Sequence, residues 1–128
     1  RVNAEGGNPE GYHPQFPRRL KMQKIGFRLQ LKMETIDQYV DHHANVWPEM
    51  LQALSETGWS NYSLFIDRRD GSLFGYVETP DIDKAKALMA EKDVNTRWQK
   101  MMGPFFEQLE GVAPDEGFFT MEQIFYLE

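Results

Sequence analysis

The sequence contains no cysteine among its 128 residues. A disulfide scaffold and a metal site built from thiolates are therefore excluded. No apolar run approaches the roughly 20 residues that a membrane-spanning helix needs. No charged start followed by an apolar segment marks a secretory signal either. We therefore expect a soluble cytoplasmic protein that does not act in or on a membrane.

Positive charge is also scarce. The net charge is −6, and basic residues form no cluster longer than a pair. Nucleic acid is not expected as a partner, because phosphate binding needs a positive face. The three histidines predict no metal site: His13 lies in a glycine- and proline-rich start, and His42 and His43 are neighbours whose side chains would diverge on a helix.

Aromatic residues, in contrast, are plentiful at 13%, with three Trp, five Tyr and nine Phe. One interpretation is a well-filled hydrophobic core. The other is a pocket walled by ring faces, as sugar-binding sites often use. Composition alone leaves both open.

Periodicity divides the chain into a short series of elements. The glycines and prolines of residues 1–20 predict a flexible tail, and residues 21–128 predict a single domain. Alternating apolar residues and a turn at Asp70-Gly71 predict strands at 24–32, 59–67, 73–78 and 120–127. Helical segments are expected after Thr35, from Pro48, from Thr79-Pro80 and after Asp93.

This order predicts an α+β protein with a ferredoxin-like βαββαβ antiparallel sheet and its helices on one face. Alternation along the second strand places Tyr62, Leu64 and Ile66 on one face, with Trp59 and Phe65 on the other. Both faces of the sheet would then carry apolar groups. We expect the helix-free face to meet a second copy in a homodimer of the α/β-barrel type.

The first helical segment carries polar groups where packing alone would place leucine. Tyr39, His43 and Trp47 recur every four residues and so share one helix face, whereas Asp37 and Asp41 fall on the opposite face. An imidazole at the edge of an apolar stripe is more often a core residue with satisfied hydrogen bonds than a functional one. On this reading His42 faces solvent or supports its neighbour, and Trp47 is a packing anchor.

Four short motifs decide between these readings. The sequence combines Tyr39-x3-His43-x3-Trp47-Pro48-Glu49 with Asn61-Tyr62, Arg97-Trp98 and Phe125-Tyr126-Leu127. In these spacings the chain resembles the L-rhamnose mutarotase family, from Met22 to Glu128. The resemblance implies a homodimeric, cofactor-independent enzyme that interconverts the α and β anomers of L-rhamnose.

The resemblance also implies roles for individual residues. His43 would be the catalytic residue, and Tyr39, Tyr62 and Trp98 would contact the sugar. Some family members carry a second tryptophan after the first, and here that substrate-binding position is occupied by Gln99. Opening a hemiacetal moves one proton onto the ring oxygen and another off the anomeric hydroxyl, which suits a group that titrates near neutrality.

Two other classes of function remain open. A dimeric barrel of this type could be a cofactor-independent oxygenase or a haem-degrading enzyme, with the same histidine as base or axial ligand. The chain could also be a non-catalytic small-molecule binder. Catalysis is favoured, because a binder needs no group that titrates near neutrality.

Overall fold

The computed structural model describes residues 21–107 and 119–128. Residues 1–20, where a tail is expected, and residues 108–118 lie outside this part. The elements are listed in chain order: β1 (Gln23–Gln30), η1 (Met33–Thr35), α1 (Ile36–Ala44), α2 (Pro48–Glu56), β2 (Ser60–Asp67), β3 (Ser72–Thr79), α3 (Ile82–Ala90), α4 (Asp93–Met102), η2 (Gly103–Phe105) and β4 (Phe119–Met121).

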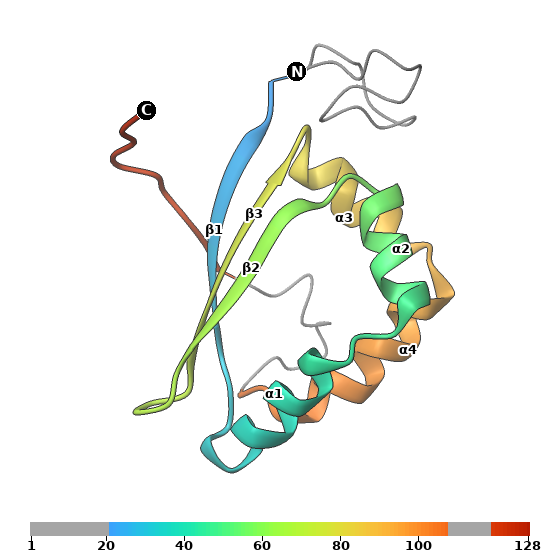
Figure 1. Ribbon diagram of the computed structural model, residues 1–128, viewed down its shortest axis with the longest axis vertical. Helices are drawn as coiled ribbons and strands as arrows, with labels where there is room; N and C mark the ends of the chain where they lie inside the picture. Colours follow the sequence, from blue (N-terminus) through green and yellow to red (C-terminus); the bar gives the residue numbers. More distant parts are fainter. Residues whose placement is uncertain (1–20, 108–118) are drawn as a thin grey trace.

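The four strands form one antiparallel sheet in the order β2-β3-β1-β4. Helices α1 to α4 all lie on one side of this sheet, and no described element covers the other side (Figure 1). The predicted ferredoxin-like α+β fold is confirmed. None of the helices in residues 21–107 and 119–128 has the length and apolarity that crossing a bilayer requires.

Strand β1 supplies the floor of the core. Phe27 and Leu29, with Leu31 just after the strand, are buried beneath the helices, whereas Arg28 is exposed on the opposite face, as the alternation predicts. Phe27 pairs with Gly75 of β3, and its ring lies across that glycine. A Cβ atom at residue 75 would overlap the ring, so the glycine makes room for Phe27.

The helical segment between β1 and β2 is divided into two helices before Pro48. Trp47 has extended backbone angles (φ −56°, ψ 133°), and α2 begins at the next residue, Pro48. Asp37 and Asp41 of α1 are exposed while Tyr39 is buried, so the predicted helix phase is confirmed. Thr35 precedes α1 as expected, but its hydroxyl donates to Lys32 O instead of capping the helix.

The helix that follows β3 begins later in the chain than predicted. Thr79 ends β3, and the residue that caps α3 is Asp81, whose carboxylate accepts a hydrogen bond from the Lys84 backbone N–H at 3.1 Å. Asp93 is the first residue of α4 and not its cap. After α4 the chain continues as the short helix η2, which contains Pro104.

A β-bulge near the start of β2 overturns one prediction. Ser60 pairs with Glu78 and Ser63 with Tyr76, so β2 has one residue more than β3 over this stretch, and Asn61 adopts φ 45°. The extra residue reverses the alternation on its N-terminal side. Trp59 therefore lies on the helix side of the sheet, 6% exposed, and its predicted place on the helix-free face is wrong.

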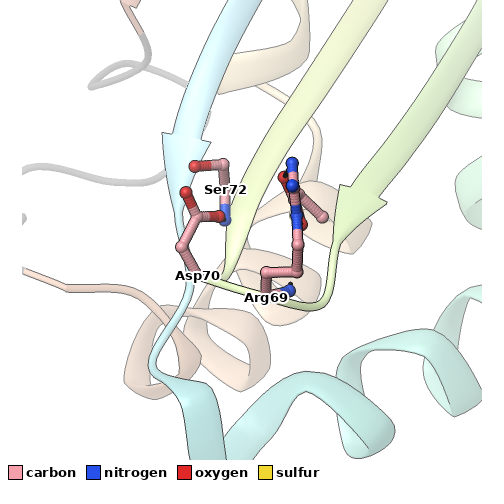
Figure 2. A network of polar contacts seen from close by, with 4 residues as sticks. Arg69, Asp70 and Ser72 are labelled. Atoms are coloured by element: carbon pink, nitrogen blue, oxygen red, sulfur yellow. Dashed lines mark hydrogen bonds and ion pairs between the residues drawn. The ribbon is translucent and has the colours of Figure 1, made fainter.

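The hairpin between β2 and β3 is held by short-range polar contacts (Figure 2). The Asp67 carboxylate accepts hydrogen bonds from the backbone N–H and the guanidinium of Arg69, and these hold the pKa of Asp67 at about 2. Asp70 accepts from the Ser72 N–H at 2.9 Å, and Gly71 has φ 79°. The turn predicted at Asp70-Gly71 is confirmed.

The last strand is shorter than predicted. Strand β4 pairs with β1 only through Gly26, Phe27 and Arg28, and residues 122–128 leave the sheet as an exposed segment (Figure 1). The predicted strand over 120–127 is therefore wrong beyond Met121. Within the described protomer no strand lies beside residues 122–127 to accept their backbone hydrogen bonds.

Candidate active site

A cavity of about 250 Å³ lies between the sheet and its helices. The residues singled out from the sequence as catalytic or substrate-binding all line it: Tyr39, His43, Tyr62, Trp98 and Gln99. They come from α1, β2 and α4, elements that are far apart in the sequence. The structure thus brings every predicted site residue to one place, and their chemical roles remain predictions.

The centre of the site is a pair of rings on α1. The rings of Tyr39 and His43 are one helical turn apart and stack with their centroids 4.2 Å apart and their planes at 29°. Nδ1 of His43 lies 2.9 Å from the backbone carbonyl oxygen of Tyr39. Because a carbonyl oxygen can only accept, Nδ1 carries the proton in this contact. A neutral His43 therefore keeps its free lone pair on Nε2.

Burial shapes the titration of both rings. It lowers the pKa of His43, an effect opposed by the hydrogen bond to Tyr39 O and reinforced by the charge of His42. Burial also raises the pKa of the Tyr39 hydroxyl, with a smaller contribution from Tyr62. At neutral pH the site accordingly holds an uncharged imidazole, able to accept a proton, beside a protonated phenol.

Trp98 forms the opposite wall. Its ring meets His43 edge to face at 5.5 Å and meets Trp47 edge to face at 5.0 Å. Trp47 itself does not line the cavity, which fits its interpretation as a packing anchor. Arg97, beside Trp98 in the sequence, points elsewhere: it bonds Asp93 at 2.8 Å and Glu49 at 3.0 Å and so ties α4 to α2.

Two further cavity residues bear on the chemistry of the site and were not predicted to belong to it. Trp59 lines the cavity, and its ring stacks on that of Tyr62 with the centroids 5.5 Å apart. Regular strand alternation places Trp59 on the other face, and the sequence carries no pattern that reveals the bulge at Asn61. Asn95 is 3% exposed and lies four residues before Gln99 on α4. That spacing, a second amide on the inward stripe of a helix, was a usable signal.

Three other polar residues of α1 and β1 lie outside the cavity. His42 stacks on Phe105 at 5.8 Å and is not a lining residue. Arg28 is exposed on the helix-free face, and Gln30 donates to the Asp70 carbonyl at 2.6 Å, so neither contributes to the pocket. Over residues 21–107 and 119–128, no three His, Asp or Glu side chains gather in a way that could hold a metal ion.

The family model for L-rhamnose mutarotase matches residues 24–127. The chain belongs to the L-rhamnose mutarotase family. Among its relatives, an L-rhamnose mutarotase of Oceanobacillus iheyensis is 36% identical over 93 residues, which cover 73% of this chain and 88% of the relative. One of Lactiplantibacillus plantarum is 32% identical over 107 residues, covering 84% of this chain and 100% of the relative.

One solved structure agrees with this family assignment, and a second shares the fold. The crystal structure of an L-rhamnose mutarotase from Formosa agariphila superposes with a TM-score of 0.67 at 26% identity, covering 83% of this chain and 99% of that one. An antibiotic biosynthesis monooxygenase superposes with a TM-score of 0.53 at 19% identity, covering 81% of this chain and 99% of that one. The second likeness concerns the fold alone.

Proposed function

We propose that this protein is an isomerase that interconverts the α and β anomers of L-rhamnose, with His43 as its catalytic residue and residues 21–128 as its catalytic domain. The observation that carries the proposal is the state of His43 in the cavity. Its Nδ1 is committed to the Tyr39 carbonyl oxygen, so Nε2 is the nitrogen left for a substrate. Family membership supplies the sugar and the reaction.

A single imidazole can carry out both proton transfers that open the sugar ring. Nε2 removes the proton from the anomeric hydroxyl as the bond between C1 and the ring oxygen breaks. The imidazolium then returns that proton to the ring oxygen, which gives the open-chain aldehyde. Rotation about the C1–C2 bond and the reverse steps close the ring on the other face. Both oxygens are bonded to the same carbon in the ring form, so one side chain can serve both.

The remaining lining residues bind and orient the ring. The hydroxyls of Tyr39 and Tyr62 are hydrogen-bonding groups for the sugar, and Trp98 offers an indole face to its apolar side. The cavity volume of about 250 Å³ lies slightly below the range of about 300–1,000 Å³ that is typical of pockets for drug-sized ligands, which suits a ligand as small as a monosaccharide.

We also propose that the protein works as a homodimer through the helix-free sheet face. Strand register puts four side chains in one row across this face: Phe65 beside Phe74, Phe74 beside Arg28, and Arg28 beside Phe119. The three phenylalanines are 65%, 51% and 73% exposed, an apolar surface that a monomer would leave in water. A second copy of the same face would cover it.

The C-terminal segment offers a second contact for the dimer. Ile124, Phe125 and Leu127 are between 77% and 89% exposed in the single protomer. Within this protomer, Lys24 Nζ lies 3.4 Å above the ring of Tyr126. The apolar side chains and unpaired backbone of residues 123–127 suit strand pairing with a partner.

The test of the proposed reaction is a magnetisation-transfer NMR experiment on L-rhamnose. Saturating the anomeric proton of one anomer should attenuate that of the other in proportion to enzyme concentration. L-Fucose, another 6-deoxy sugar, serves as the comparison for substrate choice. No enzyme-dependent exchange with L-rhamnose would contradict the proposed function.

A further inference from the structure

Two amide side chains on neighbouring turns of α4 line the cavity together. Asn95 and Gln99 are four residues apart, and both face the site. Asn95 is almost completely buried, at 3% exposure. A buried amide lowers stability unless its polar atoms are hydrogen-bonded, so its bonding partners explain why it is tolerated there.

The contacts of Asn95 fix which way its amide points. Its Nδ2 donates to the backbone carbonyl oxygen of Met89 at 3.2 Å. A carbonyl can only accept, so the nitrogen and not the oxygen of Asn95 must face Met89. Its Oδ1 is then turned toward Gln99 and accepts a hydrogen bond from Gln99 Nε2 at 3.0 Å.

The same reasoning passes the orientation on to Gln99. Because Asn95 presents an acceptor, Gln99 must present its nitrogen to Asn95, and its carbonyl Oε1 becomes the atom available elsewhere. Within the part of the chain that the structure describes, Oε1 accepts no hydrogen bond from a protein group. A cavity residue whose acceptor is held in place but unused suits a ligand hydroxyl.

We infer that Asn95 is a positioning residue that sets the Gln99 amide so that Oε1 accepts a hydrogen bond from one hydroxyl of the sugar. This inference rests on the proposed function. It makes Gln99 a determinant of which pyranoses bind well: those that carry a donor hydroxyl at the position facing α4. Sugars that lack this hydroxyl lose the contact and leave Oε1 without a partner.

The first test compares Gln99→Met, which keeps the side-chain length but removes the amide, with the unmodified protein by calorimetric titration. Gln99→Met should bind L-rhamnose about two- to tenfold more weakly, the effect of one neutral hydrogen bond. The 2-, 3- and 4-deoxy derivatives of L-rhamnose identify the hydroxyl involved. One of them should bind both proteins equally, and an equal ratio for all sugars would overturn the inference.

The second test asks whether Asn95 acts through Gln99. Asn95→Leu should weaken L-rhamnose binding in the unmodified background and have little further effect in Gln99→Met, because the orientation it provides is then useless. Fully additive losses would mean that Asn95 is only structural. Should Asn95→Leu not fold, the side-chain amide resonances of Gln99 in the unmodified protein give the answer. They should shift with L-rhamnose and not with the deoxy sugar identified above, and no shift overturns the inference.

These outcomes separate the inference from the proposed function. If the unmodified protein neither binds L-rhamnose nor exchanges its anomers, both fail together. If it does both and Gln99→Met binds every sugar as well as the unmodified protein does, only the role of Asn95 and Gln99 is contradicted.

Discussion

His43 is enclosed by Tyr39 on one side and Trp98 on another, and this enclosure governs its titration. Burial disfavours the imidazolium, so the pKa of His43 lies below its ordinary value of 6.5. A base with a lowered pKa is a weaker proton acceptor, but a larger fraction of it is in the reactive, neutral form at neutral pH. Burial thus makes His43 a weaker base and increases the fraction of it that is ready to accept a proton.

The lowered pKa predicts how activity depends on pH. Catalysis by neutral His43 should be constant near pH 7 and fall as the solution is acidified through the pKa of His43, with a midpoint below 6.5. The free energy of unfolding should depend on pH in the same direction. His43 has the higher pKa in the unfolded chain, which therefore takes up the proton first, so folding is weakened as the pH falls below about 6.5. The Hε1 resonance of His43, followed by NMR from pH 4 to 8, measures the midpoint. A value above 6.5 would contradict the burial argument.

The two neighbouring tryptophans give a second prediction at this scale. Trp98→Phe should weaken sugar binding about two- to tenfold, because a smaller ring covers less of the pyranose. Trp47→Phe is the matched control, since Trp47 packs on Trp98 without lining the cavity. Fluorescence titration with L-rhamnose measures both. A larger loss in the control than in Trp98→Phe would place the sugar elsewhere.

Single residues were predictable where a helix repeats regularly. The four-residue spacing of Tyr39 and His43 puts both on the inward face of α1, and the structure has them there. Trp59 was assigned to the wrong face because one extra residue at Asn61 reverses the strand alternation. A bulge depends on pairing with another strand, and the sequence of one strand does not contain that information.

At the scale of elements, the floor of the site depends on a glycine. Phe27 lines the cavity, and its ring occupies the space above Gly75 on the neighbouring strand. The absence of a side chain at Gly75 therefore gives the Phe27 ring room to lie over the neighbouring strand.

Gly75→Ala should destabilise the protein by about 1–3 kcal/mol, the usual effect of overpacking, and should weaken sugar binding by pushing Phe27 into the cavity. Gly26→Ala on β1 is the matched control, because its new Cβ would meet only Met121 Cε at an ordinary 3.8 Å. Urea denaturation gives the two free energies of unfolding. Equal values would mean that Phe27 moves aside without strain.

Element boundaries were predictable where backbone chemistry dictates them. Pro48 keeps Trp47 extended and starts α2, and Gly71 forms the hairpin turn. The last strand was overestimated because residues 123–127 have strand-like composition but no neighbour within the protomer. Composition can identify a segment able to pair, and only the assembled sheet decides whether it does.

At the scale of the whole molecule, the sheet has one face covered by helices and one row of exposed phenylalanines. The sequence predicted this asymmetry even though Trp59 was placed on the wrong side, since Phe65 was assigned to the open face correctly. What the sequence does not contain is the row itself, which arises from the register of β2, β3, β1 and β4.

Phe74→Lys should disrupt the proposed dimer. Burying one phenylalanine is worth about 1.5–3 kcal/mol, and twofold symmetry places the change in the interface twice, so the dimer Kd should rise about a hundredfold or more. Met33→Lys is the control, a similarly exposed apolar residue in η1, outside the sheet. Light scattering coupled to size-exclusion chromatography measures the mass. A monomeric unmodified protein would rule out the dimer.

The most direct test of the account is the rate of anomer exchange in three proteins: unmodified, His42→Ala and His43→Ala. Only His43 lines the cavity, while His42 stacks on Phe105 outside it. Magnetisation transfer on L-rhamnose, corrected for spontaneous exchange, should give His43→Ala a rate about a hundred- to ten-thousandfold below the unmodified protein. His42→Ala should stay close to the unmodified rate. Full activity in His43→Ala, or an equal loss in both variants, would contradict the assignment of proton transfer to His43.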